Sequence, residues 1–408
     1  MGDRITKNVI SINLGNYGST GSIVYGIESI SLSKKFKYCC AYPQKKDNKE
    51  KRENDYHICS EIFCKINHRL AYHSGLLGCF AAFSTLRLLW KIDRLNPDII
   101  HIHNIHGDFL NIPLLFYYIK RKDIKIVWTL HDCWAFTGRC PYFMMLHCNK
   151  WKTGCFACEY AKQSYPESMI DLSNIMWKMK KNCFTGIKKM IVITPSEWLA
   201  GIVRDSFFKE YPIKVINNGI DLSIFKIVES DFRKKYEIAE ERYIVLGVSF
   251  GWSIRKGIDI FMKLAAILGE KYQIVLVGTD EYIEKSLPNN IILIRKTKSQ
   301  YELAQIYSAA NVFVNPTRED NFPTVNMEAL ACGTPVITFN TGGSPECIDN
   351  TCGIVVENEN MDVLEKAIND VCERNIFTQE KCRERAQKFN ANDKYEAYIE
   401  IYKGMIED

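Results

Sequence analysis

The chain has 408 residues, which is too long for one typical domain and suits two α/β domains that each bury a core. Hydrophobic residues make up 47% and charged residues 25% of the chain, which excludes the disordered and fibrous classes. The net charge is a modest +5, and no surface of interleaved aromatic and basic residues is evident, so we expect no nucleic-acid partner.

The first predicted element is a strand over residues 8–14, and no leader sequence precedes it, so we expect the protein to stay in the cytoplasm. In a long chain without a leader, the sixteen cysteines indicate reduced thiols or metal ligands rather than disulfides. A glycine-rich loop with Gly15, Gly18 and Gly21 then leads into a helix. Such a turn lets backbone amides approach an anion, although this spacing alone identifies no nucleotide.

Two segments bear on membrane contact. Residues 34–52 contain eight Lys or Arg residues against Asp47 and Glu50, which is typical of a solvated loop but also suits attraction to an anionic bilayer. The uncharged stretch 70–86 is shorter than the ~20 residues that a spanning helix needs. It predicts a helix that is either buried or lies in the membrane interface. Peripheral contact with the inner face of the cell membrane is therefore the alternative location.

Histidines gather at the ends of the next two predicted strands, 99–104 and 125–132. His101, His103 and His106 surround the first strand end, and His131 is followed by an aspartate at the second. A lone histidine is more often structural than catalytic, so we expect three of these four to be packing or loop residues.

Four cysteines follow within nineteen residues, namely Cys140, Cys148, Cys155 and Cys158. Four thiols that end in a Cys-x-x-Cys pair suit a structural tetrahedral zinc site. Reduced, partly buried thiols are an equal alternative, and a disulfide is the third.

Short β-branched runs alternate with helical patterns and restart after a hinge near residues 209–222, which predicts two parallel βαβ domains. We expect one domain over residues 1–208 and the other over 209–393. A final amphipathic helix, 394–408, needs apolar surface to cover and is expected to pack on the first domain. The remaining predicted strands are 37–43, 190–196, 214–217, 243–250, 273–278, 291–295, 311–315, 335–339 and 353–357.

The predicted strand 243–250 runs into a loop that carries Arg255 and Lys256, and a helical pattern begins at Ile258. Two cations beside the free N–H groups of a helix start suit a diphosphate. The alternative is a pair of solvated basic residues.

The most informative segment is 316–346. Asp320 lies in a polar loop before a helix that starts at about Thr324, and Glu328 lies roughly one turn into that helix. Two carboxylates beside a helix N-terminus suit a ligand with hydroxyls and phosphates. Alternatively, the first is a loop acid and the second only offsets the helix dipole.

This segment resembles the signature of glycosyltransferase family 4. It has an acid, seven residues and a Glu, then Glu-Ala-x-Ala-Cys-Gly-x-Pro-Val and Gly-Gly-x-x-Glu. The resemblance implies a retaining enzyme of the GT-B fold, with two facing Rossmann-like domains, a UDP- or GDP-linked sugar donor and no catalytic divalent metal. The run 129–140 resembles a branch found in bacterial surface-polysaccharide gene clusters, which implies a glycan or lipid-linked glycan acceptor.

The resemblance also implies roles for single residues. Glu328 would hold the ribose, and Asp320 would lie by the donor sugar, although the family more often has Glu there. His131 would face the donor sugar. The remaining residues would contact the donor through backbone groups or charge, namely Gly18, Gly21, Arg255, Lys256, Phe322, Pro323 and Thr324.

Two other classes of function stay open at this point. A nucleotide-sugar epimerase on the same fold would turn over the nucleotide sugar without an acceptor. A non-enzymatic scaffold would use the basic run and the cysteines, but it would leave Glu328, Lys256 and His131 without a purpose.

Overall fold

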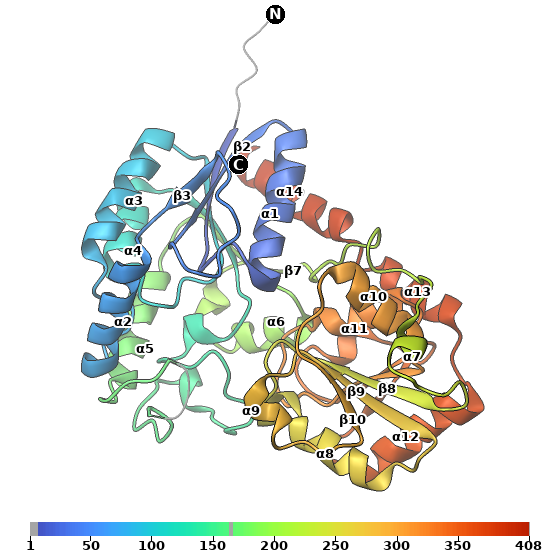
Figure 1. Ribbon diagram of the computed structural model, residues 1–408. Coiled ribbons are helices and arrows are strands. Elements are labelled where there is room, and N and C mark those ends of the chain that lie inside the picture. Colours follow the sequence, from blue (N-terminus) through green and yellow to red (C-terminus); the bar gives the residue numbers. More distant parts are fainter. Residues whose placement is uncertain (1–6, 163–165, 408) are drawn as a thin grey trace, which may run out of the picture. The chain divides into compact units, whose positions relative to one another are not determined.

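The computed structural model describes residues 7–162 and 166–407 (Figure 1). It divides into two compact units. The first contains the chain up to Ile216 and again from Lys394 onward, and the second spans Asn217–Asp393. Each unit contains one parallel β-sheet. The first unit extends beyond residue 208 because the strand Ile213–Val215 pairs with its sheet.

The first sheet has seven strands in the order β3-β2-β1-β4-β5-β6-β7. The strands are β1 (Lys7–Ile12), β2 (Phe36–Tyr42), β3 (Asp55–His57), β4 (Ile99–Ile102), β5 (Lys125–Thr129), β6 (Met190–Thr194) and β7 (Ile213–Val215). The α-helices of its connections are α1 (Gly18–Ser33), α2 (Glu61–Ser74), α3 (Ala82–Leu95), α4 (Ile112–Lys122), α5 (Ser173–Phe184) and α6 (Glu197–Arg204).

The second sheet has six strands in the order β10-β9-β8-β11-β12-β13. The strands are β8 (Tyr243–Val248), β9 (Tyr272–Val277), β10 (Ile291–Ile294), β11 (Val312–Asn315), β12 (Val336–Phe339) and β13 (Gly353–Val356). The α-helices after β7 are α7 (Phe232–Lys235), α8 (Ile258–Ile267), α9 (Glu281–Glu284), α10 (Gln300–Ala309), α11 (Thr324–Ala331), α12 (Met361–Arg374), α13 (Gln379–Gln387) and α14 (Ala391–Glu407).

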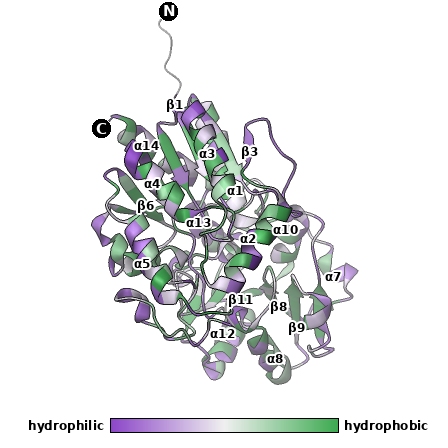
Figure 2. Ribbon diagram, turned by 90° about the vertical axis from the view of Figure 1, so that its left-hand side faces the viewer, coloured by the Kyte–Doolittle hydropathy of each residue, from purple (hydrophilic) through white to green (hydrophobic). Residues whose placement is uncertain are grey.

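Hydrophobic residues run along the strands, whereas the helices alternate hydrophilic and hydrophobic stretches (Figure 2). Strands that are covered on both faces need such continuous apolar runs, which explains why the sequence predicted all but one of them within a few residues. The strand that it missed is β3. Asp55 opens it and accepts hydrogen bonds from the hydroxyls of Tyr25 and Tyr42 at 2.7 and 2.6 Å. Its place in the sheet is fixed by these tertiary contacts rather than by local pattern.

The order of the strands reverses once in each sheet, between β1 and β4 in the first and between β8 and β11 in the second. Loops that leave such a reversal point diverge to opposite faces of the sheet, so a crevice opens beyond the carboxyl ends of the two strands. The candidate residues of the second unit follow β8 and β11, and those of the first unit follow β1, β4 and the neighbouring β5.

The final helix α14 packs on the first unit, as the sequence predicted (Figure 1). Tyr398, Ile399, Tyr402 and Met405 join the buried cluster formed with α1, β1 and β2. Gly26 of α1 leaves room for the ring of Tyr395, because a Cβ there would lie 2.1 Å from a ring carbon.

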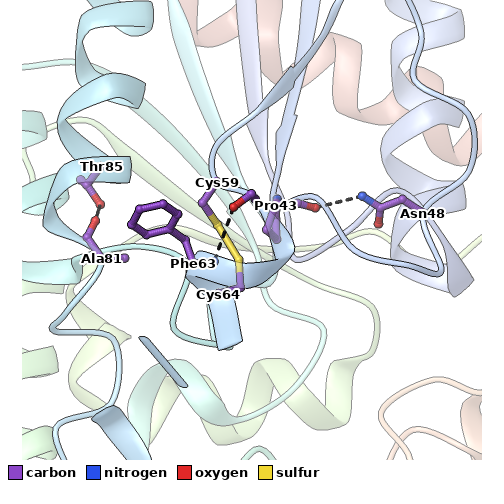
Figure 3. The surroundings of a disulfide bond; sticks show 8 residues. Pro43, Asn48, Cys59, Phe63, Cys64, Ala81 and Thr85 are labelled. Atoms are coloured by element: carbon purple, nitrogen blue, oxygen red, sulfur yellow. Dashed lines mark hydrogen bonds between the residues drawn. A yellow bond between two sulfur atoms is a disulfide. The ribbon is translucent and has the colours of Figure 1, made fainter. Parts of the chain in front are cut away.

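Two expectations about the first unit are wrong. Residues 70–86 do not form one helix, because Gly75 and Gly78 adopt positive φ angles of 77° and 72° between α2 and α3. Cys59 and Cys64 form a disulfide rather than reduced thiols (Figure 3). The start of α2 brings their Cα atoms to 6.7 Å, within the range that a disulfide spans.

Among the helices of residues 7–162 and 166–407, none combines the length and the apolar character that crossing a bilayer requires.

Candidate functional site

The candidate site of the second unit is built on the loops that follow β8 and β11. The loop after β8 ends in a short 3-10 turn, Ile254–Lys256. The carbonyl of Arg255 accepts a hydrogen bond from the backbone N–H of Arg318 at 2.8 Å, which joins this turn to the loop after β11. Gly257 has a φ of 78°, and a Cβ on it would lie 2.4 Å from the Pro316 carbonyl oxygen. The close approach of the two loops therefore requires glycine.

An ion pair links these two loops. Lys256 Nζ lies 2.5 Å from Asp320 Oδ2, and the two side chains are 21% and 20% exposed. The guanidinium of Arg255 donates to the Glu319 carbonyl at 2.9 Å. The sequence analysis predicted a diphosphate contact for Lys256 and a donor-sugar contact for Asp320. In the structure these two side chains contact each other. Because both side chains keep some exposure to solvent, a ligand anion can take the place of the Asp320 carboxylate beside Lys256.

Glu328 lies in α11, half-buried, and accepts a hydrogen bond from the Tyr307 hydroxyl at 3.2 Å. Burial raises the pKa of Glu328 to about 7, and the hydrogen bonds from Tyr307 and Thr324 partly counteract this rise. The carboxyl group is therefore divided between its neutral and ionised forms near neutral pH. A ligand that donates hydrogen bonds to it would favour the ionised form.

The first turn of α11 presents backbone N–H groups without a side-chain cap, because the capping position is occupied by Pro323. Such N–H groups and the helix dipole favour an anion or an oxygen-rich ligand. The preceding Phe322 has a buried side chain, and its carbonyl accepts a hydrogen bond from the Asn218 amide at 3.1 Å. Phe322, Pro323 and Thr324 are therefore held in place by the core beneath them.

A buried polar network that the sequence did not reveal supports this helix start. Asn326 is fully buried, and its side chain bonds to the amide of Asn315 at 2.7 Å and to the hydroxyl of Ser344 at 3.0 Å. Ser344 in turn lies 2.6 Å from the Thr338 hydroxyl. Gly342 has a φ of 57°, and a Cβ on it would lie 1.8 Å from the Asp320 carbonyl oxygen. The Gly-Gly loop therefore packs directly on the loop that carries Asp320.

In the first unit, the glycine-rich loop follows β1 and is organised by Asn16. The Asn16 amide donates to the hydroxyls of Tyr25 and Tyr42 at 3.0 and 3.1 Å, and its oxygen accepts from the Lys49 N–H at 2.8 Å. Gly18 begins α1, and a Cβ on Gly21 would lie 2.5 Å from the Asn16 carbonyl carbon. The basic run 34–52 is thus not one solvated loop, since it contains β2 and is bonded to Asn16.

The histidines at the ends of β4 and β5 form a packed row. His103 Nδ1 lies 3.0 Å from His131 Nε2, and the ring of His103 lies 3.9 Å from that of His101. His101 contacts the hydroxyls of Tyr402 and Thr129 at 2.6 and 2.8 Å. Burial lowers the pKa of His131 to about 4 and moves those of His101 and His103 well below their usual range. These imidazoles are therefore neutral at pH 7.

The fourth histidine, His106, contacts Oδ2 of Asp132, the residue after His131, at 3.0 Å. Nearby His106 and hydrogen bonds hold the pKa of Asp132 below its usual range despite burial.

The expected zinc site is not formed. Within residues 7–162 and 166–407, no three His, Cys, Asp or Glu side chains are grouped closely enough to hold a metal ion. Burial raises the pKa values of Cys140 and Cys155 to about 12 and 11, and Cys155 accepts a hydrogen bond from the Gly138 N–H at 3.0 Å. Cys148 and Cys158 are partly exposed free thiols. The alternative of reduced, partly buried thiols describes all four.

A buried lysine, rather than a metal ion, holds the segment that leads to Cys140 in place. Lys180 of α5 is fully buried and donates to the carbonyls of Trp134 and Thr137 at 2.7 and 3.1 Å. Its ammonium also lies 3.5 Å from the centre of the Trp134 ring.

Two family models match the chain and together span most of it. The model described as Glycosyltransferase Family 4 matches residues 46–224, and the model described as Glycosyl transferases group 1 matches residues 228–389. A curated relative is the "Putative colanic acid biosynthesis glycosyl transferase WcaC" of Escherichia coli (strain K12). It is 24% identical over 76% of this chain and 77% of its own length.

Solved structures with the same fold cover nearly the whole chain. Sucrose-phosphate synthase from Thermosynechococcus elongatus matches with a TM-score of 0.71 at 18% identity, over 98% of this chain and 99% of its own. Alr3699/HepE from Anabaena in complex with UDP-glucose matches with a TM-score of 0.66 at 15% identity, over 97% and 99%.

Proposed function

The chain belongs to glycosyltransferase family 4 and has the two Rossmann-like domains of the GT-B fold, and from this premise we propose that it transfers a sugar with retention from a nucleotide-sugar donor. The observation that carries the proposal is the pairing, at the reversal point of the second sheet, of Lys256 with Asp320 in the loop that leads into α11 and Glu328. This set offers a cation, a carboxylate and uncapped backbone N–H groups to one ligand.

In the second unit, Glu328 accepts hydrogen bonds from the ribose hydroxyls, and Arg255 and Lys256 hold the diphosphate. Asp320 and the backbone of residues 322–324 hold the donor sugar. In the transfer step, the bond between the anomeric carbon and the diphosphate breaks, and the acceptor oxygen bonds to that carbon on the same face. The acceptor proton moves to the leaving phosphate. The two cations stabilise the charge that develops on the diphosphate.

In the first unit, His131 and the loop of Gly18 and Gly21 contact the substrates. Because the pKa of His131 is lowered to about 4, the neutral imidazole supplies a hydrogen bond rather than a positive charge. Its Nε2 is held by His103 at 3.0 Å, which fixes the ring for this task.

The acceptor is a glycan or lipid-linked glycan of a cell-envelope polysaccharide. The relative WcaC, which is named for colanic acid biosynthesis, supports this class of acceptor. We therefore propose that the enzyme works in the cytoplasm, at the inner face of the cell membrane.

Thermal stabilisation by UDP- and GDP-linked sugars tests the donor. A ligand at 100 times its dissociation constant adds ~2.7 kcal/mol of stability, which shifts the melting temperature measurably. We expect one base to stabilise the protein and the other not. Product analysis with the stabilising donor then separates the activities: a new nucleotide sugar formed without acceptor would identify an epimerase and end the transfer proposal.

A further inference from the structure

Large apolar side chains project to solvent from the outer faces of α2 and α3. Their exposed fractions lie between 47% and 70%. The residues, which together we name the α2–α3 face, are Ile62, Phe63, Ile66, Leu70, Phe83, Leu86 and Trp90. They recur every three or four residues, so each helix shows a continuous apolar row.

These rows are not the faces that hold the helices to the domain. The buried side of α2 is formed by Cys64, Asn67 and Ala71, and that of α3 includes Leu88 and Ile92. Both helices therefore already have their partners in the fold, and the outer rows contribute nothing to its core. A second apolar face on a surface helix points to an external partner.

Figure 2 looks onto the side of the first unit that carries α2, α3 and the adjacent α4. Figure 3 shows Phe63 of α2 together with Ala81 and Thr85 at the start of α3 around the Cys59–Cys64 disulfide, so the first turns of the two helices lie in one neighbourhood. Tyr117 of α4, which is 64% exposed, adds another aromatic ring to this side.

Positive charge is concentrated on the same three helices. Together α2, α3 and α4 contain eight Lys or Arg residues and only two acids. Eight positive charges less two negative ones give these helices a net charge of +6, whereas the entire chain has a net charge of +5. Both acids are paired, since Glu61 lies 2.7 Å from Lys65 and Asp93 lies 3.0 Å from Lys122. Helical spacing places Arg87, Lys91 and Arg94 on the same side of α3 as its apolar row, and the Arg94 guanidinium stacks 3.6 Å from the Trp90 ring.

We propose that the α2–α3 face is a docking surface for an anionic lipid bilayer. Interfacial helices combine bulky apolar residues with Lys and Arg, and Trp and Tyr favour the headgroup region. A second copy of the chain does not fit, because a symmetric contact would bring this positive surface against itself. The use of the surface in delivering a lipid-linked acceptor rests on the proposed function, whereas the binding itself does not.

Vesicle sedimentation with the full chain tests the surface. We expect binding to vesicles of phosphatidylglycerol and phosphatidylethanolamine, and much weaker binding to phosphatidylcholine vesicles. The double variant Phe83→Ser, Trp90→Ser should lower binding at least about ten-fold, because binding scales with buried apolar area. The double variant Arg87→Gln, Arg94→Gln should lose roughly five-fold per charge at low salt and little at high salt.

A matched control changes two exposed apolar residues of the second unit, Val363→Ser and Ile376→Ser, and should bind vesicles like the parent. Nucleoside diphosphate binding should be unchanged in every variant, which shows that each is folded and separates this inference from the proposed function. Equal vesicle binding by the parent and the Phe83→Ser, Trp90→Ser variant would overturn the proposal. So would concentration-dependent dimerisation that this variant abolishes.

Discussion

The two points at which strand order reverses differ in their electrostatics. In the second unit, Lys256, Asp320 and Arg255 carry charge at the ends of β8 and β11. In the first unit, the end of β4, which borders the reversal point, and the end of its neighbour β5 present a row of imidazoles that burial keeps neutral, and His106 contacts Asp132 at 3.0 Å beside this row. Similar topology therefore holds charged side chains at the strand ends of one unit and uncharged imidazoles at those of the other.

This difference separates binding from chemistry. Charges that contact a diphosphate already act on the free nucleotide, so the loss of one of them lowers nucleotide affinity as well as turnover. A neutral hydrogen-bond donor aimed at developing charge contributes mainly in the transition state. Substitutions of the charged residues that contact the diphosphate in the second unit should therefore lower nucleotide affinity, whereas substitution of His131 in the first unit should lower turnover alone.

The largest effect is expected for His131→Ala. It should lower turnover at least ~100-fold and leave nucleoside diphosphate binding unchanged, because the charged ligand site lies in the other unit. Steady-state kinetics and calorimetry measure the two effects. His57→Ala, a change in strand β3 of the same sheet, is the control and should have little effect on either. A loss of donor affinity without loss of turnover would make His131 a binding residue.

The charged site should be broken by Lys256→Met. Hydrogen bonds to charged groups contribute ~1.5 to 3 kcal/mol, so diphosphate affinity should fall by roughly ten- to a hundred-fold. The loss should be at the upper end because Asp320 would then face the phosphates without its partner at 2.5 Å. Calorimetry with the nucleoside diphosphate is the measurement, and the exposed Lys271→Met of the same unit is the control. Unchanged affinity would place the diphosphate elsewhere.

Glu328→Gln should weaken nucleoside diphosphate binding by about ten-fold, since the ribose contact is the same in the free nucleotide and the nucleotide sugar. Asp362→Asn, in the first turn of α12, is a control at another helix start.

The raised pKa of Glu328 adds a pH dependence. The unliganded carboxyl group titrates near pH 7, and the ribose hydroxyls bond best to its ionised form. Affinity should therefore rise as the pH increases through about 7 and level off above it. Binding at pH 7 should release a fraction of a proton, which calorimetry in buffers of different ionisation enthalpy detects. Glu328→Gln should abolish this release, and a parent protein without it would rule out the proposed contact.

The sequence could predict that the charged residues gather at one edge of the second sheet because they lie in two continuous segments. The strands before them are apolar runs with clear ends, and parallel strands bring their carboxyl ends to one edge, so Lys256 and Asp320 had to lie near each other. The contact of 2.5 Å between them and the support of Asn326 depend on side-chain packing across three loops. No local pattern encodes such contacts.

The first unit was less predictable for the same reason. Strand β3 depends on hydroxyls from Tyr25 and Tyr42, and the break between α2 and α3 depends on two glycines inside an otherwise helical stretch. The cysteines after β5 have a spacing that suits zinc, but the buried ammonium of Lys180 holds that loop. The outer rows of α2 and α3 could be recognised only once the structure showed which side of each helix is buried.

The smallest effect on binding is expected for Asp320→Asn, and it sharpens the comparison within the charged site itself. Asp320 is proposed to contact the donor sugar, which the free nucleoside diphosphate lacks. The substitution removes a negative charge that lies 2.5 Å from Lys256 and frees that cation for the phosphates. Diphosphate affinity should therefore change by less than about two-fold, or rise slightly, while transfer is impaired because the sugar is no longer positioned. Calorimetry on Asp320→Asn beside Glu328→Gln decides the matter, since equal losses of affinity in the two variants would show that the ribose and sugar contacts have been assigned to the wrong acids.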